Sequence, residues 1–366
     1  MRSASLELPS IPRWSFLCIG AGALGTYIGT SLILAGQRVV FLVRPTTAEV
    51  LRARGLRLVL NGMTHTIPEP LLVTSLDEAL TRGPYDIGLV TIKAYDVEAL
   101  ARDLLPYRAA LPPLVCLQNG VESEAILARV VGESNVVSAT LTSAVARPAP
   151  GEAVLERLRG IGVAGDHKLI PPLLAILNAA GLHAREYPNA MAMKWSKLLT
   201  NLLGNASAAI LDMTPAEIFA HPGLYAMEVG QVREALAVMR ALRLRVVNLP
   251  GTPLRPLVVL MNTLPLCLSQ RVLSPFLSRG RGRKMPSLHI DLHGGRGQTE
   301  VDFLNGAVVR WGQRLGIPTP INRVLNETLL ALSRGDLPLT TFQKRPEVLL
   351  DLVQRAREES YTHERT

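Results

Sequence analysis

The sequence has few cysteines, few aromatic residues and few charges for its length. Three of its 366 residues are cysteine, which excludes a disulfide framework and is typical of reduced cytosolic thiols, so we expect a cytoplasmic protein. Aromatic residues make up 4%, so the core is expected to be aliphatic. Charged residues make up 19%, below the roughly 25% usual in globular domains. Hydrophobic residues make up 48%, which excludes a chain that is disordered throughout.

The charge that is present is mostly positive. Lysine and arginine number 39 against 30 acidic residues, a net charge of +9, which suits an acidic partner. Nucleic-acid binding predicts basic residues interleaved with aromatics or placed on a recognition helix, and neither pattern appears. We therefore expect an anionic small molecule and no nucleic acid.

Residues between Arg13 and Arg38 carry no charge, and their number alone would suit a transmembrane helix. Four glycines between Gly20 and Gly29 suit a tight turn better than a helix facing lipid. We therefore expect no membrane insertion and interpret residues 1–13 as a flexible arm.

A short apolar run, residues 14–19 (WSFLCI), predicts a buried strand that leads into GAGALG at residues 20–25. A helical pattern follows to Leu34, and residues 38–43 (RVVFLV) predict a second strand. In this setting a G-x-G-x-x-G motif indicates a dinucleotide site, because its glycines permit the turn, the approach of a pyrophosphate and close helix packing. The phosphates would bind at the helix N-terminus. The predicted cofactor-binding residues are Gly20, Ala21, Gly22, Ala23, Leu24 and Gly25.

Three polar residues follow predicted strands, where α/β sheets bind ligands. Arg44 follows the second strand at the position where NAD-binding sites carry an acid, and its guanidinium could bind a 2′-phosphate, so NADPH is favoured over NADH. Lys93 and Asn119 follow residues 86–92 and 114–117, and both are also predicted to contact the cofactor. The alternatives are a solvated loop for Arg44 and Lys93 and a simple Asn-Gly turn for Asn119.

The second half of the chain is helical in pattern. Residues 190–212 predict one helix, on which Lys197, Asn201 and Asn205 would form a single polar stripe four residues apart. Gly204 suggests that another group approaches this helix closely. A solvated face would be richer in charged residues, so we favour a polar pocket.

A second helix is predicted from Thr299 to Leu315. Thr299 and Asp302 suggest a capping box, which places Glu300 in the first turn. Glu300 either interacts only with the helix dipole or points its carboxylate into a cleft.

Other segments yield weaker predictions. The apolar stretch 249–279 could form a homodimer surface or a lid, and the basic cluster 279–284 has no assigned role. His289 and His293 are four residues apart, but no acid or cysteine stands at a suitable spacing, so we expect no metal.

The sequence resembles the ketopantoate reductase (2-dehydropantoate 2-reductase) family. The resemblance covers roughly residues 14–335 and includes GAGALG at 20–25, VTIKAY at 90–95, LQNG at 117–120, WSKLLTNLLGN at 195–205, KMPS at 284–287, TEVDFLNG at 299–306 and GIPTPIN at 316–322. It implies an α/β N-terminal Rossmann domain with a mostly parallel sheet, an all-α C-terminal domain, and an active site in the cleft. It also implies reduction of ketopantoate to pantoate with NADPH, a step toward pantothenate and coenzyme A.

The resemblance also implies roles for single residues. Lys197 matches the general acid, and Glu300 matches the carboxylate that holds the substrate hydroxyl. Arg44 matches the arginine that reads the 2′-phosphate, and Lys93 matches a lysine near the nicotinamide. Residues that match substrate-contacting positions are Asn119, Asn201, Asn205 and Ser287.

The predicted division is a flexible arm (1–13), an NADP-binding Rossmann domain (14–187), a helical substrate and catalytic domain (188–340) and a charged C-terminal segment (341–366). Glu122 stands where the family more often has a small residue, which puts the shape of the substrate in doubt.

Two functions remain as alternatives to a ketopantoate reductase. They are a reductase of another 2-keto acid and a non-catalytic NADP-binding protein.

Overall fold

The computed structural model describes residues 12–281, 285–295 and 297–363. Residues 1–11 of the predicted arm and residues 282–284 of the basic cluster, which include Lys284 of the KMPS motif, lie outside these residues. The chain divides into two units. Unit 1 comprises the chain up to Gln118, Ser123–Ala190 and Pro250–Thr252, and unit 2 comprises Asn119–Glu122, Met191–Leu249 and the chain from Pro253.

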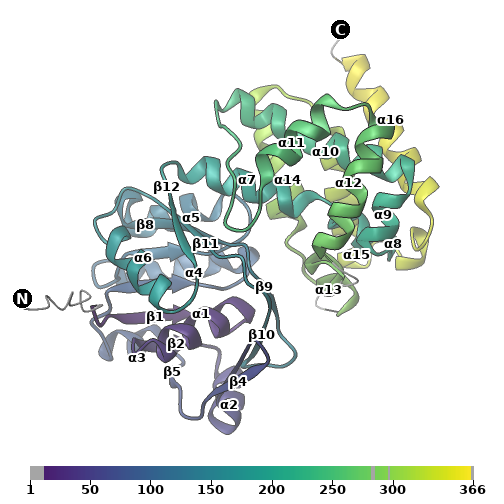
Figure 1. The fold of residues 1–366 in the computed structure, drawn as a ribbon. Coiled ribbons are helices and arrows are strands. Elements are labelled where there is room, and N and C mark those ends of the chain that lie inside the picture. Colours follow the sequence, from purple (N-terminus) through teal and green to yellow (C-terminus); the bar gives the residue numbers. More distant parts are fainter. Residues whose placement is uncertain (1–11, 282–284, 296, 364–366) are drawn as a thin grey trace, which may run out of the picture. The chain divides into compact units, whose positions relative to one another are not determined.

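Unit 1 is built on an eight-stranded sheet whose strands run in the order β12-β11-β8-β7-β6-β1-β2-β5 (Figure 1). All neighbours are parallel except β8 and β11. This is the mostly parallel α/β sheet that the sequence predicts. The strands are β1 (Ser15–Ile19), β2 (Arg38–Leu42), β5 (Leu71–Val73), β6 (Ile87–Val90), β7 (Leu114–Cys116), β8 (Val136–Leu141), β11 (Ile161–Ala164) and β12 (Ala184–Tyr187).

Both faces of this sheet are buried, which explains the continuous apolar runs of its strands. In β1, Phe16 and Cys18 pack into one hydrophobic cluster, and Leu17 and Ile19 pack into the other, because successive side chains alternate across a strand. The first cluster includes side chains of α1 (Ala23–Leu34) and α6 (Ile170–Ala179). The second includes side chains of α3 (Leu76–Thr81), α4 (Val97–Leu104) and α5 (Ser123–Val131).

A smaller sheet, ordered β4-β3-β10-β9, completes the strands of unit 1. Its strands are β3 (Leu56–Leu60), β4 (Met63–Ile67), β9 (Ala144–Ala146) and β10 (Glu152–Arg157). The uncharged run after Arg13 therefore forms β1, a turn and α1. Within the described ranges, no helix combines the length and apolarity that a bilayer crossing requires.

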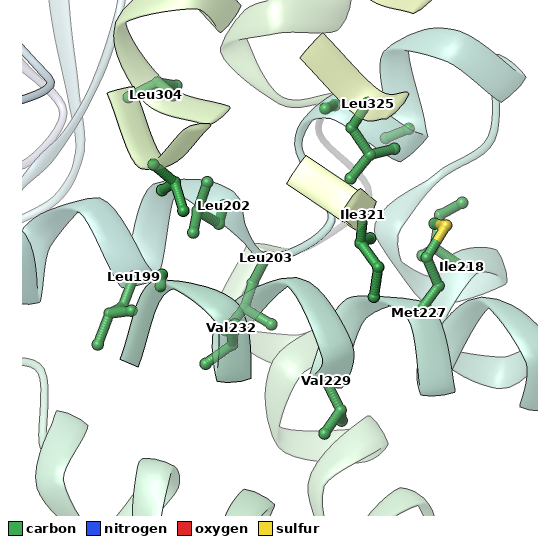
Figure 2. Packing of buried hydrophobic residues seen from close by; sticks show 14 of the residues in the cluster. Leu199, Leu202, Leu203, Ile218, Met227, Val229, Val232, Leu304, Ile321 and Leu325 are labelled. Atoms are coloured by element: carbon green, nitrogen blue, oxygen red, sulfur yellow. The ribbon is translucent and has the colours of Figure 1, made fainter. Parts of the chain in front are cut away.

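The described residues of unit 2 form helices joined by turns and loops, as the sequence predicts. Its core is mostly aliphatic, and Figure 2 shows Leu199, Leu202, Leu203, Val229 and Val232 among the side chains that form it. The helices are α7 (Ala190–Leu202), α8 (Ala206–Leu211), α9 (Pro215–Ala220), α10 (Pro222–Ala241), α11 (Leu254–Thr263), α12 (Leu266–Arg281), α13 (Ser287–His293), α14 (Val301–Leu315), α15 (Pro320–Arg334) and α16 (Pro346–His363).

The short segment Pro250–Thr252 belongs to unit 1 although it follows a long stretch of unit 2. The Thr142 hydroxyl donates to the Pro250 carbonyl over 2.9 Å. A Cβ at Gly160 would lie 2.8 Å from the Pro250 ring, and a Cβ at Gly251 would lie 2.8 Å from the Arg159 side chain. These three residues therefore complete the packing of unit 1.

The three cysteines differ sharply in accessibility. Cys18 and Cys116 are buried and Cys267 is exposed. Burial raises the pKa of the Cys18 thiol to about 12, although a hydrogen bond with Thr91 lowers it somewhat. Because alkylation requires an accessible thiolate, we expect iodoacetamide to modify Cys267 rapidly in the native protein and Cys18 only after unfolding. Mass spectrometry of peptides would measure both rates.

The matched control is Cys267→Ser, which should abolish the rapid phase. Labelling of Cys18 at the rate of Cys267 in native protein would contradict the burial of β1.

Candidate active site

The glycine turn that joins β1 to α1 has the geometry that the motif predicts. Gly20 has a φ of +104°, and its N–H donates to the Leu42 carbonyl of β2 over 2.9 Å. A Cβ at Gly25 would lie 2.2 Å from the Gly20 carbonyl oxygen, so only glycine lets α1 approach the turn this closely. A Cβ at Gly22 would meet no atom within 4 Å, so space is left beside the N-terminus of α1.

Two side chains that the sequence reasoning did not single out support this turn. The Thr91 hydroxyl lies 3.0 Å from the carbonyl oxygens of both Ile19 and Gly20. The Cys18 thiol lies 3.3 Å from the Gly20 carbonyl. Cys18 precedes the motif by two residues and Thr91 stands in VTIKAY, but neither residue type marks such a role in a sequence.

Arg44 lies where the sequence predicts, at the start of α2 (Pro45–Arg54) just after β2. Its guanidinium is largely exposed and lies 3.5 Å from the Asp96 carboxylate. Asp96 ends a short 3-10 helix, Ala94–Asp96, that begins directly after Lys93. An exposed pair of this kind is weak, so the guanidinium can exchange its partner for an anion at little cost.

The prediction of one helix over residues 190–212 is wrong in one respect, because the structure has two helices there. α7 ends at Leu202, and α8 begins at Ala206. Gly204 between them has a φ of +55°, which a continuous α-helix does not contain. The stripe of Lys197, Asn201 and Asn205 therefore does not lie on one straight helix. Lys197 and Asn201 share a face of α7, and Asn205 precedes α8.

The break nevertheless keeps the asparagines together in one chain of contacts. Asn201 Nδ2 donates to Asn119 Oδ1 over 3.1 Å, and Asn205 Nδ2 donates to the Asn201 carbonyl over 3.0 Å. Asn205 Oδ1 accepts from the Leu288 N–H over 3.2 Å. The neighbouring Ser287 begins α13 and is exposed. Unit 2 thus brings together three of the predicted substrate-contacting amides and connects them to the helix that carries Ser287.

The close approach suggested by Gly204 is confirmed. A Cβ at this position would lie 3.1 Å from the Phe219 ring. The Gly204 N–H donates to the fully buried Glu228 carboxylate over 2.6 Å, and Glu228 also accepts from Ser207 and Gln231. Glu228 was missed by the sequence reasoning because nothing in its surroundings on α10 distinguishes it from a solvated helix position.

The capping box predicted at the start of α14 is wrong. The Thr299 hydroxyl accepts from the Val301 N–H over 3.4 Å, and α14 begins at Val301 with Glu300 at the N-cap position. Asp302 is drawn away from Thr299 because Arg310 donates to its carboxylate over 2.9 Å. Glu300 is 3% exposed, and its side chain makes no hydrogen bond that caps α14.

Glu122, the residue that departs from the family pattern, binds the same arginine. Arg310 donates to Glu122 over 2.6 Å and to the Asp302 carbonyl over 2.7 Å. A Cβ at Gly120 would lie 2.5 Å from the Phe303 carbonyl. The turn 119–122 is therefore held against the first turns of α14, which positions Asn119.

The candidate residues fall into two sets. Residues 20–25, Arg44 and Lys93 belong to unit 1, where a glycine turn and two cations can receive an anionic ligand. The set in unit 2 combines a partly buried lysine, three amides and a buried carboxylate, and is suited to bind a polar molecule and transfer a proton. It consists of Asn119, Lys197, Asn201, Asn205, Ser287 and Glu300.

A Rossmann-type unit followed by an all-helical unit with these polar residues defines a two-domain class of oxidoreductase. Family models identify the member of this class. The model described as ketopantoate reductase PanE/ApbA matches residues 16–167, and the model of the C-terminal part of the same family matches residues 189–333. The chain therefore belongs to the ketopantoate reductase PanE/ApbA family.

Individual relatives agree with this assignment. A 2-dehydropantoate 2-reductase of Archaeoglobus fulgidus is 29% identical over 87% of this chain and 96% of its own length. The crystal structure of a PanE/ApbA family ketopantoate reductase from Ralstonia eutropha is similar, with a TM-score of 0.73 and 27% identity, over 88% of this chain and 99% of that one. A D-mandelate dehydrogenase with NADH and anilino(oxo)acetate shares the fold, with a TM-score of 0.71 and 22% identity over 88% and 99% of the two chains.

Proposed function

We propose that this protein reduces 2-dehydropantoate to pantoate with NADPH. The observation that carries the proposal is the arrangement on α7, where Asn201 links Asn119 to Asn205 and Lys197 stands one helical turn before Asn201. Four residues advance a helix by about 40°, so Lys197 and Asn201 lie on the same side of α7. A cation beside several amide groups suits a small keto acid, which offers a carboxylate and a carbonyl oxygen.

Unit 1 fits a dinucleotide. The space beside Gly22 admits the backbone approach that a pyrophosphate requires. Gly22 is the N-cap of α1, and the first N–H groups of a helix, which lack partners within it, favour an anion. Arg44 would bind the 2′-phosphate of NADPH, and Lys93 would lie near the nicotinamide. The reduced nicotinamide supplies a hydride to the keto carbon when it is bound.

The protein's own groups would handle charge and protons in this reaction. As hydride reaches carbon, negative charge develops on the keto oxygen, and the Lys197 ammonium stabilises that charge and donates a proton to the oxygen. Glu300 would accept a hydrogen bond from the substrate hydroxyl. Asn119, Asn201 and Asn205 would orient the carbonyl and the carboxylate.

The decisive experiment is a panel of 2-keto acids assayed with NADPH and with NADH. The loss of absorbance at the nicotinamide band gives kcat/KM for each pair. We expect 2-dehydropantoate with NADPH to have the highest value. A higher value for another branched or longer 2-keto acid would reassign the substrate within the same mechanism.

Two alternatives are distinguished by the same panel. The shared fold of D-mandelate dehydrogenase makes aromatic 2-keto acids the informative rivals, so the panel includes the keto acid that corresponds to mandelate. NADPH binding without turnover of any keto acid would instead favour a non-catalytic cofactor-binding protein.

Arg44→Ala tests the cofactor assignment. Removal of the guanidinium should raise the Kd for NADPH about 10-fold or more and change the Kd for NADH little, because only NADPH carries the 2′-phosphate. Fluorescence titration with both nucleotides measures the two values. Asp96→Asn is the matched control, since it removes the partner of Arg44 and should not weaken NADPH. An equal loss of affinity for NADPH and NADH in Arg44→Ala would refute the assignment of Arg44 to the 2′-phosphate.

A further inference from the structure

One cluster of side chains lies apart from the residues assigned to catalysis. Asp212, His289 and His293 each offer one ligating atom, and these atoms lie within 4.8 Å of one another. His289 and His293 stand four residues apart on α13, and their rings stack with centroids 4.1 Å apart. Asp212 ends α8 in the left-handed conformation, with a φ of +48°.

The Nε2 atoms of both histidines face the C-terminal turn of α8. His289 Nε2 lies 2.7 Å from Asp212 Oδ1, and His293 Nε2 lies 3.1 Å from the Ala209 carbonyl oxygen. Carbonyl oxygens at a helix C-terminus carry partial negative charge, so this position favours a cation. We expected no metal at these histidines because no acid or cysteine stands at a suitable spacing in the sequence. That reason is wrong, because Asp212, which is 77 residues before His289, contacts it in the fold.

We propose that Asp212, His289 and His293 bind a zinc ion. Two imidazole nitrogens and one carboxylate oxygen are a donor set that zinc accepts, with water at the fourth tetrahedral position. Ligands at about 2.0 Å from a tetrahedral ion lie about 3.3 Å apart, so small side-chain rotations suffice to bring these atoms into place. The Asp212–His289 and His293–Ala209 hydrogen bonds would give way to metal–ligand bonds.

The surrounding groups are compatible with a bound cation. Gln343 Nε2 donates to Asp212 Oδ2 over 3.0 Å, which orients the carboxylate and leaves Oδ1 directed at His289. Lys344 is a positive charge near His289, and it pairs with Glu217 at 3.3 Å. Its charge is thus balanced by a carboxylate.

The consequence of metal binding would be mechanical. The ion would join α13 to the end of α8, and α13 begins at Ser287 beside the Leu288 N–H that binds Asn205. Zinc would therefore stiffen the helix that carries one proposed substrate contact. The metal itself takes no part in the proposed reduction, so binding and turnover are separate questions.

The test uses the full-length chain without an affinity tag, titrated with zinc chloride by isothermal calorimetry. We expect one ion per chain with a Kd in the micromolar range or tighter. His293→Asn and Asp212→Asn should each weaken binding at least 10-fold. His293 is exposed, so its substitution should leave the fold intact even if a change at Asp212 does not. His65→Asn, on β4 of unit 1, is the matched control and should bind zinc like the parent protein.

A second readout identifies the geometry. Cobalt(II) bound by this donor set in tetrahedral geometry should give intense visible ligand-field bands, which His293→Asn should remove. Saturation with zinc should also raise Tm in the parent and not in His293→Asn, because a ligand that binds only the folded state stabilises it. Absence of saturable zinc binding, or binding that survives His293→Asn unchanged, would overturn the proposal.

Discussion

Lys197→Ala is expected to lower kcat for the keto acid by about 10²- to 10⁴-fold, the usual contribution of a positioned general acid. The Kd for NADPH should change little, because the glycine turn, Arg44 and Lys93 lie in unit 1 and Lys197 lies in unit 2. Stopped-flow or steady-state kinetics with 2-dehydropantoate give kcat, and fluorescence titration gives the Kd.

The matched control is Lys168→Ala, which removes an exposed lysine from unit 1 and should keep full activity. Circular dichroism should show both variants folded, since Lys197 is only partly buried. Turnover of Lys197→Ala within a few-fold of the parent would remove this residue from the mechanism and transfer the role of proton donor elsewhere.

Gly25→Ala should destabilise the protein even when no nucleotide is present. The added Cβ would lie 2.2 Å from the Gly20 carbonyl oxygen and 2.6 Å from the Thr91 hydroxyl, so the backbone of the turn must move. Overpacking of this kind costs about 2–3 kcal/mol. We expect Tm to fall by roughly 5–10 °C in thermal unfolding followed by circular dichroism.

Gly22→Ala is the informative comparison. Its Cβ would meet no protein atom within 4 Å, so Tm of the nucleotide-free protein should stay within about 2 °C of the parent. The methyl group would occupy the space that the pyrophosphate needs, and NADPH affinity should fall about 10-fold or more. A stable Gly25→Ala variant, or an unstable Gly22→Ala variant, would contradict the separate roles given to these glycines.

The sequence predicts unit 1 well because its signals are local. An apolar strand, a glycine turn and a helix follow each other within thirty residues, and each leaves its own pattern of hydrophobicity. The mostly parallel sheet and the helical second half are confirmed. The exact domain boundary at residues 187 and 188 and the roles of the site residues stay predictions.

The predictions that are wrong concern features that depend on contacts between residues distant in the sequence. Hydrophobic periodicity continues from α7 into α8, whereas the buried Glu228 carboxylate and the Phe219 ring contact the break at Gly204 and stabilise it. Asp302 has the spacing of a capping residue, but Arg310 competes for its carboxylate. Asp212 meets His289 through tertiary packing, which spacing in the sequence cannot reveal.

The segment Pro250–Thr252 limits how this chain can be divided. A fragment that stops after α7 would lack the residues that cover Gly160 and bind Thr142, although every strand of the large sheet would be present. Conversely, the turn 119–122 would stay with such a fragment and be missing from the helical part, where Arg310 holds it. The chain therefore passes between its units more than once, and chimeras between relatives need matched exchanges at both places.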